Sequence, residues 1–264
     1  MKTAKPVPVS IAPGYDNQPN FSADGTRILF AANRDGKQID VYVHERGSGK
    51  VAQLTQTAEN ENSPTYLPDG IGAPGGFSVV QTEPDRTQRL WRFNAQGRAP
   101  QLVLTDIKPV GYHVWIDGDH LVLFVLGQPA TLQIANVTTG KAAIAADNIG
   151  RSLHRIPGSR LASFVQREPS GEYWIKQIDI TTRKIDPLVK TVEGSSDRDS
   201  AWMPDGKTIL MTAGTKVLSW TRAERAWTEV FDGAPHQLGA ITRLSVSPKG
   251  DAIAMVVAEP SARR

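Results

Sequence analysis

The stretch that decides the fold is Phe21-Ser22-Ala23-Asp24-Gly25, which precedes the almost continuously apolar run Ile28–Ala32. Asp-Gly supplies a hairpin turn because glycine tolerates a positive φ, and an apolar run of this length is typical of a strand buried on both faces. The same pattern recurs along the chain. Its further copies are Tyr66-Leu67-Pro68-Asp69-Gly70, Trp115-Ile116-Asp117-Gly118, the degenerate Ile156-Pro157-Gly158, Trp202-Met203-Pro204-Asp205-Gly206 and Val246-Ser247-Pro248-Lys249-Gly250.

The spacing of these copies indicates a repeat architecture. The six turn glycines are on average 45 residues apart. Units of roughly 40–45 residues with four strands each are typical of β-propeller blades. In the first unit, residues 39–44 alternate apolar and polar side chains, the pattern of a half-buried third strand. The equivalent third strands are predicted over 88–93, 131–135, 173–179 and 216–220.

We therefore predict an all-β chain that folds as a single domain, a six-bladed β-propeller with four-stranded antiparallel blades. The blades are expected at about 14–55, 60–104, 110–146, 150–190, 197–231 and 240–258. The last unit is too short for four strands. Because Val9 precedes Phe21 by the same 12 residues that separate Leu54 from Tyr66, residues 7–11 are predicted to close the ring as the outer strand of the last blade.

The repeat resembles that of TolB-like propellers. The resemblance rests on NQPNFSADGTRILFAANRDGKQIDVYV from residue 17, YLPDG from residue 66 and AWMPDGKTILM from residue 201, and it covers the whole chain at repeat level. TolB-like propellers are common in bacterial periplasmic proteins. The same repeat occurs in the propeller domains of prolyl-oligopeptidase-type hydrolases and in oligogalacturonate lyase. The resemblance thus implies the fold and leaves the function open.

Composition excludes several classes of function. The chain has 264 residues and no cysteine, so disulfides and thiolate metal sites are absent. Its net charge is +3 with dispersed basic residues, which does not suit a nucleic-acid partner. The longest apolar runs, 121–126 and 252–258, fall far short of the ~18 residues that span a bilayer, so no membrane insertion is expected. We expect a monomer that is periplasmic or secreted, with a cytoplasmic location left open because no signal peptide is visible.

Two short motifs resemble catalytic or cofactor motifs without their context. Residues 70–75 match G-x-G-x-x-G, yet they contain proline and lead into a strand, whereas a dinucleotide site needs a helix N-terminus. Residues 150–154 lack the last glycine of a G-x-S-x-G nucleophile elbow. Neither dinucleotide binding nor serine hydrolysis is expected. Tryptophans on predicted strands are expected to pack between blades, and these are Trp91, Trp115, Trp174, Trp202 and Trp220.

The entry to the first strand of each unit is the candidate site. In propellers these positions surround the mouth of the central channel, and here they carry polar side chains. The candidate ligand-binding residues are Asn17, Gln18, Asn62, Tyr112, His113, Arg151, His154, Asp199 and Arg243, with Ser152, Asp197 and Thr242 close by. Charged loops at 33–35, 83–86 and 167–168 share that face and could form a rim for a partner, because binding sites concentrate on loops held by a rigid scaffold.

Three interpretations of this ring remain open. The first is a non-enzymatic binding or scaffold propeller that holds a protein partner or a small polar or carbohydrate ligand. The second is a metal-assisted lyase or hydrolase acting on a carbohydrate, with a divalent cation at His113 and His154, since imidazole is a common metal ligand. The resemblance to oligogalacturonate lyase implies such a site, although that site needs about three histidines. In the third, these side chains only bind water.

Overall fold

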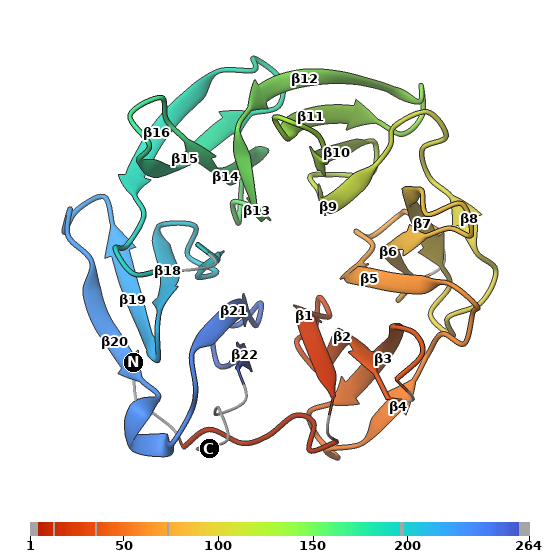
Figure 1. Ribbon diagram of the computed structural model, residues 1–264, viewed down its shortest axis with the longest axis horizontal. Coiled ribbons are helices and arrows are strands. Elements are labelled where there is room, and N and C mark those ends of the chain that lie inside the picture. Colours follow the sequence, from red (N-terminus) through yellow and green to blue (C-terminus); the bar gives the residue numbers. More distant parts are fainter. Residues whose placement is uncertain (1–4, 13, 35, 73, 196–197, 259–264) are drawn as a thin grey trace.

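A ring of antiparallel sheets surrounds a central axis in the computed structural model, which describes residues 5–12, 14–34, 36–72, 74–195 and 198–258 (Figure 1). Five sheets have four strands, and in each one the strands follow one another in chain order from the axis outward (Figure 1). The all-β propeller with four-stranded antiparallel blades is therefore confirmed.

The strands of the five four-stranded blades have the following bounds. The first blade holds β1 (Tyr15–Phe21), β2 (Arg27–Asn33), β3 (Asp40–Glu45) and β4 (Val51–Gln53), and the second holds β5 (Asn60–Tyr66), β6 (Phe77–Thr82), β7 (Gln88–Phe93) and β8 (Gln101–Leu102). The third holds β9 (Val110–Trp115), β10 (His120–Val125), β11 (Thr131–Asn136) and β12 (Lys141–Asp147). The fourth holds β13 (Ile149–Arg155), β14 (Leu161–Arg167), β15 (Tyr173–Asp179) and β16 (Ile185–Lys190). The fifth holds β17 (Ser200–Trp202), β18 (Thr208–Ala213), β19 (Lys216–Thr221) and β20 (Thr228–Asp232).

The sixth sheet differs from the prediction. Among the described residues it has two strands, β21 (Ile241–Val246) and β22 (Ile253–Val257), so the ring contains five four-stranded blades and one two-stranded sheet. A short 3₁₀ turn, η1 (Ala234–His236), leads into it. None of the described residues lies in a helix long and apolar enough to cross a membrane.

The predicted closing strand at 7–11 is wrong, because these residues form no strand. The segment runs along the outside of the ring beside the two-stranded sheet, between β20 and β1 (Figure 1). Pro6 and Pro8 lack the N–H that a ladder needs on one edge, and proline is confined to edge strands and bulges for that reason. Only Val9 packs against the core, on Phe21 and Ala254, whereas Val7 is 84% exposed.

The core lies between neighbouring blades. The middle strands β2 and β6 are nearly continuously buried, and Leu29 of the first blade meets Phe77 and Val79 of the second. The third and fourth blades pack in the same way through Val122 and Phe164. Burying one such side chain stabilises the fold by roughly 1.5–3 kcal/mol, so the flat faces of each sheet hold the ring together. The indoles of Trp115 and Trp202, discussed below, reach across these interfaces as predicted.

The innermost strands carry the candidate site. They are β1, β5, β9, β13, β17 and β21, and they stand around the axis (Figure 1). Bulges interrupt β1 between Asn17 and Asn20 and β5 between Asn62 and Thr65. Within these bulges Gln18 and Ser63, 45 residues apart, both have a left-handed backbone with φ of 57° and 53°. A bulge changes the direction of the side chains at a strand end. The side chains of these entry residues therefore do not alternate between the two faces of the sheet as they would in a regular strand.

Candidate functional site

Several polar side chains at the strand entries join neighbouring blades. Each accepts a hydrogen bond from a main-chain N–H of the next innermost strand, one repeat further along the chain. The pairs are Gln18 Oε1 with Ser63 (2.7 Å), Asn20 Oδ1 with Tyr66 (2.9 Å), Ser152 Oγ with Ser200 (3.1 Å) and Asp199 Oδ2 with Leu244 (2.8 Å). Gln18 and Asp199, which were candidates for ligand binding, therefore have a structural task at the junctions between blades.

His113 lies inside the interface between the second and third blades. Its Nε2 is 2.7 Å from Ser78 Oγ, and the Trp115 indole N–H donates to the same hydroxyl at 2.9 Å. Trp202 repeats the arrangement by donating to Ser163 Oγ at 2.8 Å. Burial lowers the pKa of His113 to about 3, so its ring is neutral at ordinary pH. This histidine packs in the interface and does not face the axis as a free ligand.

A polar bridge spans the axis. Arg243 of β21 donates from Nη2 to the Tyr112 hydroxyl of β9 at 2.6 Å, and its guanidinium carbon lies 5.0 Å from the centre of the Tyr112 ring. The strands β9 and β21 stand on opposite sides of the ring (Figure 1). Arg243 Nη1 also lies 3.7 Å from Asp199 Oδ1, and Arg243 is only 8% exposed. Two of the predicted site residues thus meet across the molecule, and a third pairs with them.

The charges around this bridge affect each other. Burial raises the pKa of Asp199 to about 6, although Arg243 and the Leu244 N–H act in the opposite direction. Burial and the Arg243 charge lower the pKa of His154 to about 4. Burial also raises the pKa of Tyr15, at the start of β1. These pKa values make the His154 ring neutral at neutral pH and leave the Asp199 carboxyl group ionised.

The two histidines that were predicted to hold a cation lie in different surroundings. His113 Nε2 is engaged by Ser78 in a blade interface, whereas His154 Nε2 lies 3.2 Å from Ser152 Oγ of its own strand. No group of three or more histidine, aspartate or glutamate side chains in the described part of the chain could hold a metal ion. His113 and His154 therefore have separate hydrogen-bond partners, each a serine hydroxyl.

The remaining candidates are dispersed. Asn17 Oδ1 accepts the main-chain N–H of Gln18 at 2.8 Å, and Asn62 is half-buried at the entry to β5. Asp197 lies outside the described residues. Arg151, at the entry to β13, is the candidate that borders a cavity.

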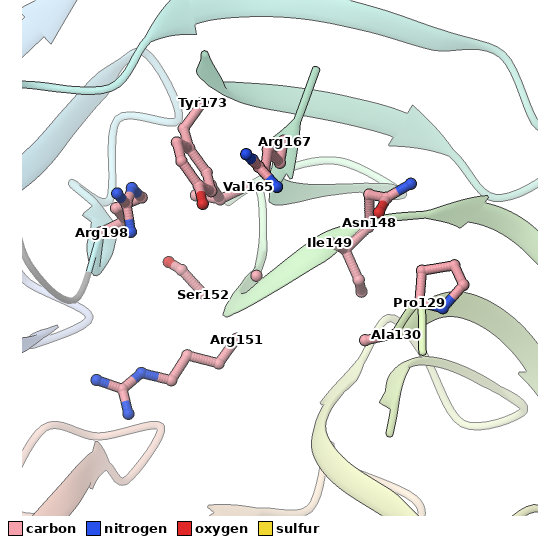
Figure 2. A pocket seen from close by; sticks show the side chains of 11 residues that line it. Pro129, Ala130, Asn148, Ile149, Arg151, Ser152, Val165, Arg167, Tyr173 and Arg198 are labelled. Carbon is pink, nitrogen blue, oxygen red and sulfur yellow. The ribbon is translucent and has the colours of Figure 1, made fainter. Parts of the chain in front are cut away.

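The cavity has a volume of about 460 Å³ and lies where the third, fourth and fifth blades meet. It is bordered by the loop between β10 and β11, the entry to β13, the end of β14, the start of β15 and the residues before β17. Its lining is Pro129, Ala130, Asn148, Ile149, Gly150, Arg151, Ser152, Val165, Arg167, Tyr173 and Arg198 (Figure 2). The described lining includes three arginines and no acidic residue.

Arg198 has a fixed place in this cavity. Its guanidinium carbon lies 3.6 Å from the centre of the Tyr173 ring, close enough for a strong cation–π contact. Arg198 has a left-handed backbone, with φ of 51°. Figure 2 shows Arg198 and Arg167 on either side of Tyr173, while the Arg151 side chain extends away from Arg167. Arg167 was predicted to lie on a rim loop, whereas no sequence pattern pointed to Tyr173 or Arg198 as cavity residues.

Comparison with known proteins supports the fold. No protein-family model matches the chain, and no curated protein matches it either. The chain is similar to the structure of putative TolB from Agrobacterium tumefaciens, with 16% identity, a TM-score of 0.72 and coverage of 94% of this chain and 92% of that one. It is similar to TolB from Acinetobacter baumannii, with 14% identity and a TM-score of 0.63, over 93% of this chain and 55% of that one.

A third similar structure is an enzyme. Oligogalacturonate lyase from Vibrio parahaemolyticus shares 14% identity at a TM-score of 0.58, over 94% of this chain and 88% of that one. At these identities the likeness concerns the fold and not the activity. Taken with the sheet order, the comparisons show that this chain has a TolB-like β-propeller fold.

Proposed function

We propose that this protein is a non-enzymatic binding propeller that holds a small polar ligand in the cavity at the entry to β13. The observation that carries the proposal is the cavity itself, because its volume of about 460 Å³ falls within the roughly 300–1,000 Å³ typical of small-molecule sites. It also lies at strand ends and loops held by a rigid ring, where binding residues concentrate.

The lining chemistry supports binding. The Arg167 guanidinium and the Tyr173 phenol bring polar groups to the cavity, and Pro129 with its neighbours offers an apolar wall. A few placed polar groups on an apolar wall fix the orientation of a ligand. We further propose that the protein acts as a monomer in the periplasm or outside the cell, where the resemblance of its repeat suggests that it works.

The proposal is tested by screening small polar metabolites for an increase in the melting temperature and mapping each hit by hydrogen exchange. A ligand is expected to protect residues 148–152 and the segment after residue 198. Ala130→Trp should place a bulky ring in the cavity and abolish the stabilisation. Ala142→Trp, on the exposed outer strand β12, serves as the matched control. Hits that protect other regions, or that survive Ala130→Trp, would overturn the proposal.

A further inference from the structure

We propose that a second cavity, at the outer rim of the ring, binds a small aromatic anion whose ring lies on an apolar wall and whose acidic group meets Arg222 and Arg225. This site goes beyond the proposed function, because it lies in a different cavity and takes a different class of ligand. The rim cavity has a volume of about 360 Å³. That volume falls within the roughly 300–1,000 Å³ typical of small-molecule sites.

The rim cavity lies between the outer strands of the fourth and fifth blades. The fourth blade contributes Trp174 of β15 and residues 187–190 of β16, and the fifth contributes Trp220 of β19 and the turn that follows. Counted from the axis, β15 and β16 are the third and fourth strands of their blade, and β19 is the third strand of its own (Figure 1). The rim cavity shares no lining residue with the cavity at the entry to β13.

Apolar side chains form much of the wall. Leu188 and Val189 are half-buried and pack with Trp220 in the core between the two blades, while Pro187 is exposed and Trp174 half-buried at the border of the cavity. Trp220 is only 5% exposed, and its buried indole N–H has no hydrogen-bond partner among the described residues. A buried donor without a partner is costly. An aromatic ligand therefore finds apolar surface here, together with a donor that the protein leaves unused.

The charged residues give the rim cavity a positive balance. Its described lining includes Lys190, Arg222 and Arg225 and no acidic residue. Lys190 is neutralised by Glu172, with Nζ 2.9 Å from Oε1. Arg222 donates from Nη2 to the amide oxygen of Gln177 at 3.0 Å, and because that acceptor is neutral the arginine keeps its charge. Arg225 makes no ion pair with any described residue, so two arginine charges remain.

The turn after β19 brings these two arginines to one cavity. The main-chain N–H of Arg225 donates to Thr221 O at 3.1 Å, and Arg225 has a left-handed backbone with φ of 58°. This turn lets Arg222 and Arg225, three residues apart, border the same space. Guanidinium groups bind carboxylate and related oxyanions through paired, charge-assisted hydrogen bonds. The combination of apolar wall and guanidinium groups therefore fits an aromatic molecule with one acidic group.

The test is isothermal titration of the full chain with three probes that share one ring, namely indole-3-acetate, neutral indole and cationic tryptamine. Indole-3-acetate is expected to bind most tightly and tryptamine most weakly. Arg225→Gln should weaken the binding of indole-3-acetate about fivefold, in keeping with the modest strength of exposed ion pairs, and should leave the binding of indole unchanged. Equal affinities for the three probes, or no binding of indole-3-acetate, would overturn the inference.

The matched control is Arg92→Gln, because Arg92 bonds to Gln101 in the second blade as Arg222 bonds to Gln177 here. Equal weakening by Arg92→Gln and Arg225→Gln would reveal nonspecific charge attraction and overturn the inference. Melting temperatures show whether each variant is folded.

The variant Ala130→Trp separates this inference from the proposed function. It fills the cavity at the entry to β13 and should leave the binding of indole-3-acetate unchanged. Loss of binding in Ala130→Trp would place the probe in that other cavity and overturn the inference, while the proposed function would stand. Conversely, a metabolite screen without hits at the entry to β13 defeats the proposed function and leaves the rim cavity to this titration.

Discussion

Two junctions between neighbouring blades share one kind of contact, a side-chain oxygen that accepts a main-chain N–H of the next blade, but they differ in the side chain that makes it. Between the first and second blades, the long Gln18 side chain reaches the Ser63 N–H and Asn20 reaches the Tyr66 N–H. Between the fourth and fifth blades, the short Ser152 side chain makes the corresponding contact with Ser200, and the 460 Å³ cavity lies beside it. The side chain at this contact is thus long in the first junction and short in the junction beside the cavity.

The two junctions also differ in the charged groups that they contain. The first holds a fully buried carboxyl group, Glu61, which accepts hydrogen bonds from the hydroxyls of Thr55 (2.8 Å) and Thr57. The second presents the guanidinium groups of the cavity. The repeat thus sets the backbone of both junctions, whereas the polar side chains that depart from the repeat give each junction its own charge.

The largest expected effect concerns Glu61. Burial raises its pKa to about 7 from the ordinary value near 4.5, against the hydrogen bonds from Thr57 and Thr55. Between these pH values the folded protein holds a proton that the unfolded chain has released, so the free energy of unfolding falls as the pH rises. The limit of this loss is about 3 kcal/mol, at roughly 1.4 kcal/mol per pKa unit. Glu61→Gln should flatten the slope.

Urea unfolding at pH 5 and pH 8 measures this difference for the wild type and Glu61→Gln. Asp199, whose pKa is also raised, contributes equally to both proteins, so subtracting one profile from the other isolates Glu61. Parallel pH profiles would show that the first junction does not depend on a protonated carboxyl group.

Removing the Gln18 side-chain amide, which joins the first two blades, is expected to have the next largest effect on stability. Gln18→Ala leaves the N–H of the buried Ser63 without its partner, which should cost about 1–3 kcal/mol. Chemical denaturation measures the loss. Gln101→Ala, on the exposed strand β8, is the control and should change stability by no more than about 0.5 kcal/mol. Equal stabilities of the two variants would contradict the structural role of Gln18.

The smallest effect on stability is expected at the junction between the fourth and fifth blades, beside the cavity. Ser152→Ala also removes an acceptor from a main-chain N–H, that of Ser200. Because Ser152 lines the cavity, water can take over that hydrogen bond at little cost, so the loss should stay at about 1 kcal/mol or less. The same denaturation series provides the measurement. A loss equal to that of Gln18→Ala would mean that water does not replace the Ser152 hydroxyl at the fourth–fifth junction.

Local sequence signals predicted most of the fold. The Asp-Gly turns mark the hairpins because only a few residues tolerate that backbone, and the third strand predicted at 88–93 coincides with β7. The fate of residues 7–11 was not predicted correctly. Spacing suggested a strand, but Pro6 and Pro8 remove the donors that a ladder requires, and a spacing argument does not weigh that loss.

The candidate site was predictable only in part. The strand entries were found from the repeat, and Tyr112, Asp199 and Arg243 do meet near the axis. The bulges after Asn17 and Asn62 change side-chain directions, and no sequence pattern records them. The cavity was missed because its lining comes from three blades, so its residues are neighbours in space and distant along the chain.

The hydrogen bond between Tyr112 and Arg243 connects strands on opposite sides of the ring. Opposite walls are tied together at that level, so the third and sixth sheets are linked directly across the axis as well as through their neighbours around the ring. A change in the tilt of one of these sheets is therefore transmitted to the sheet that faces it.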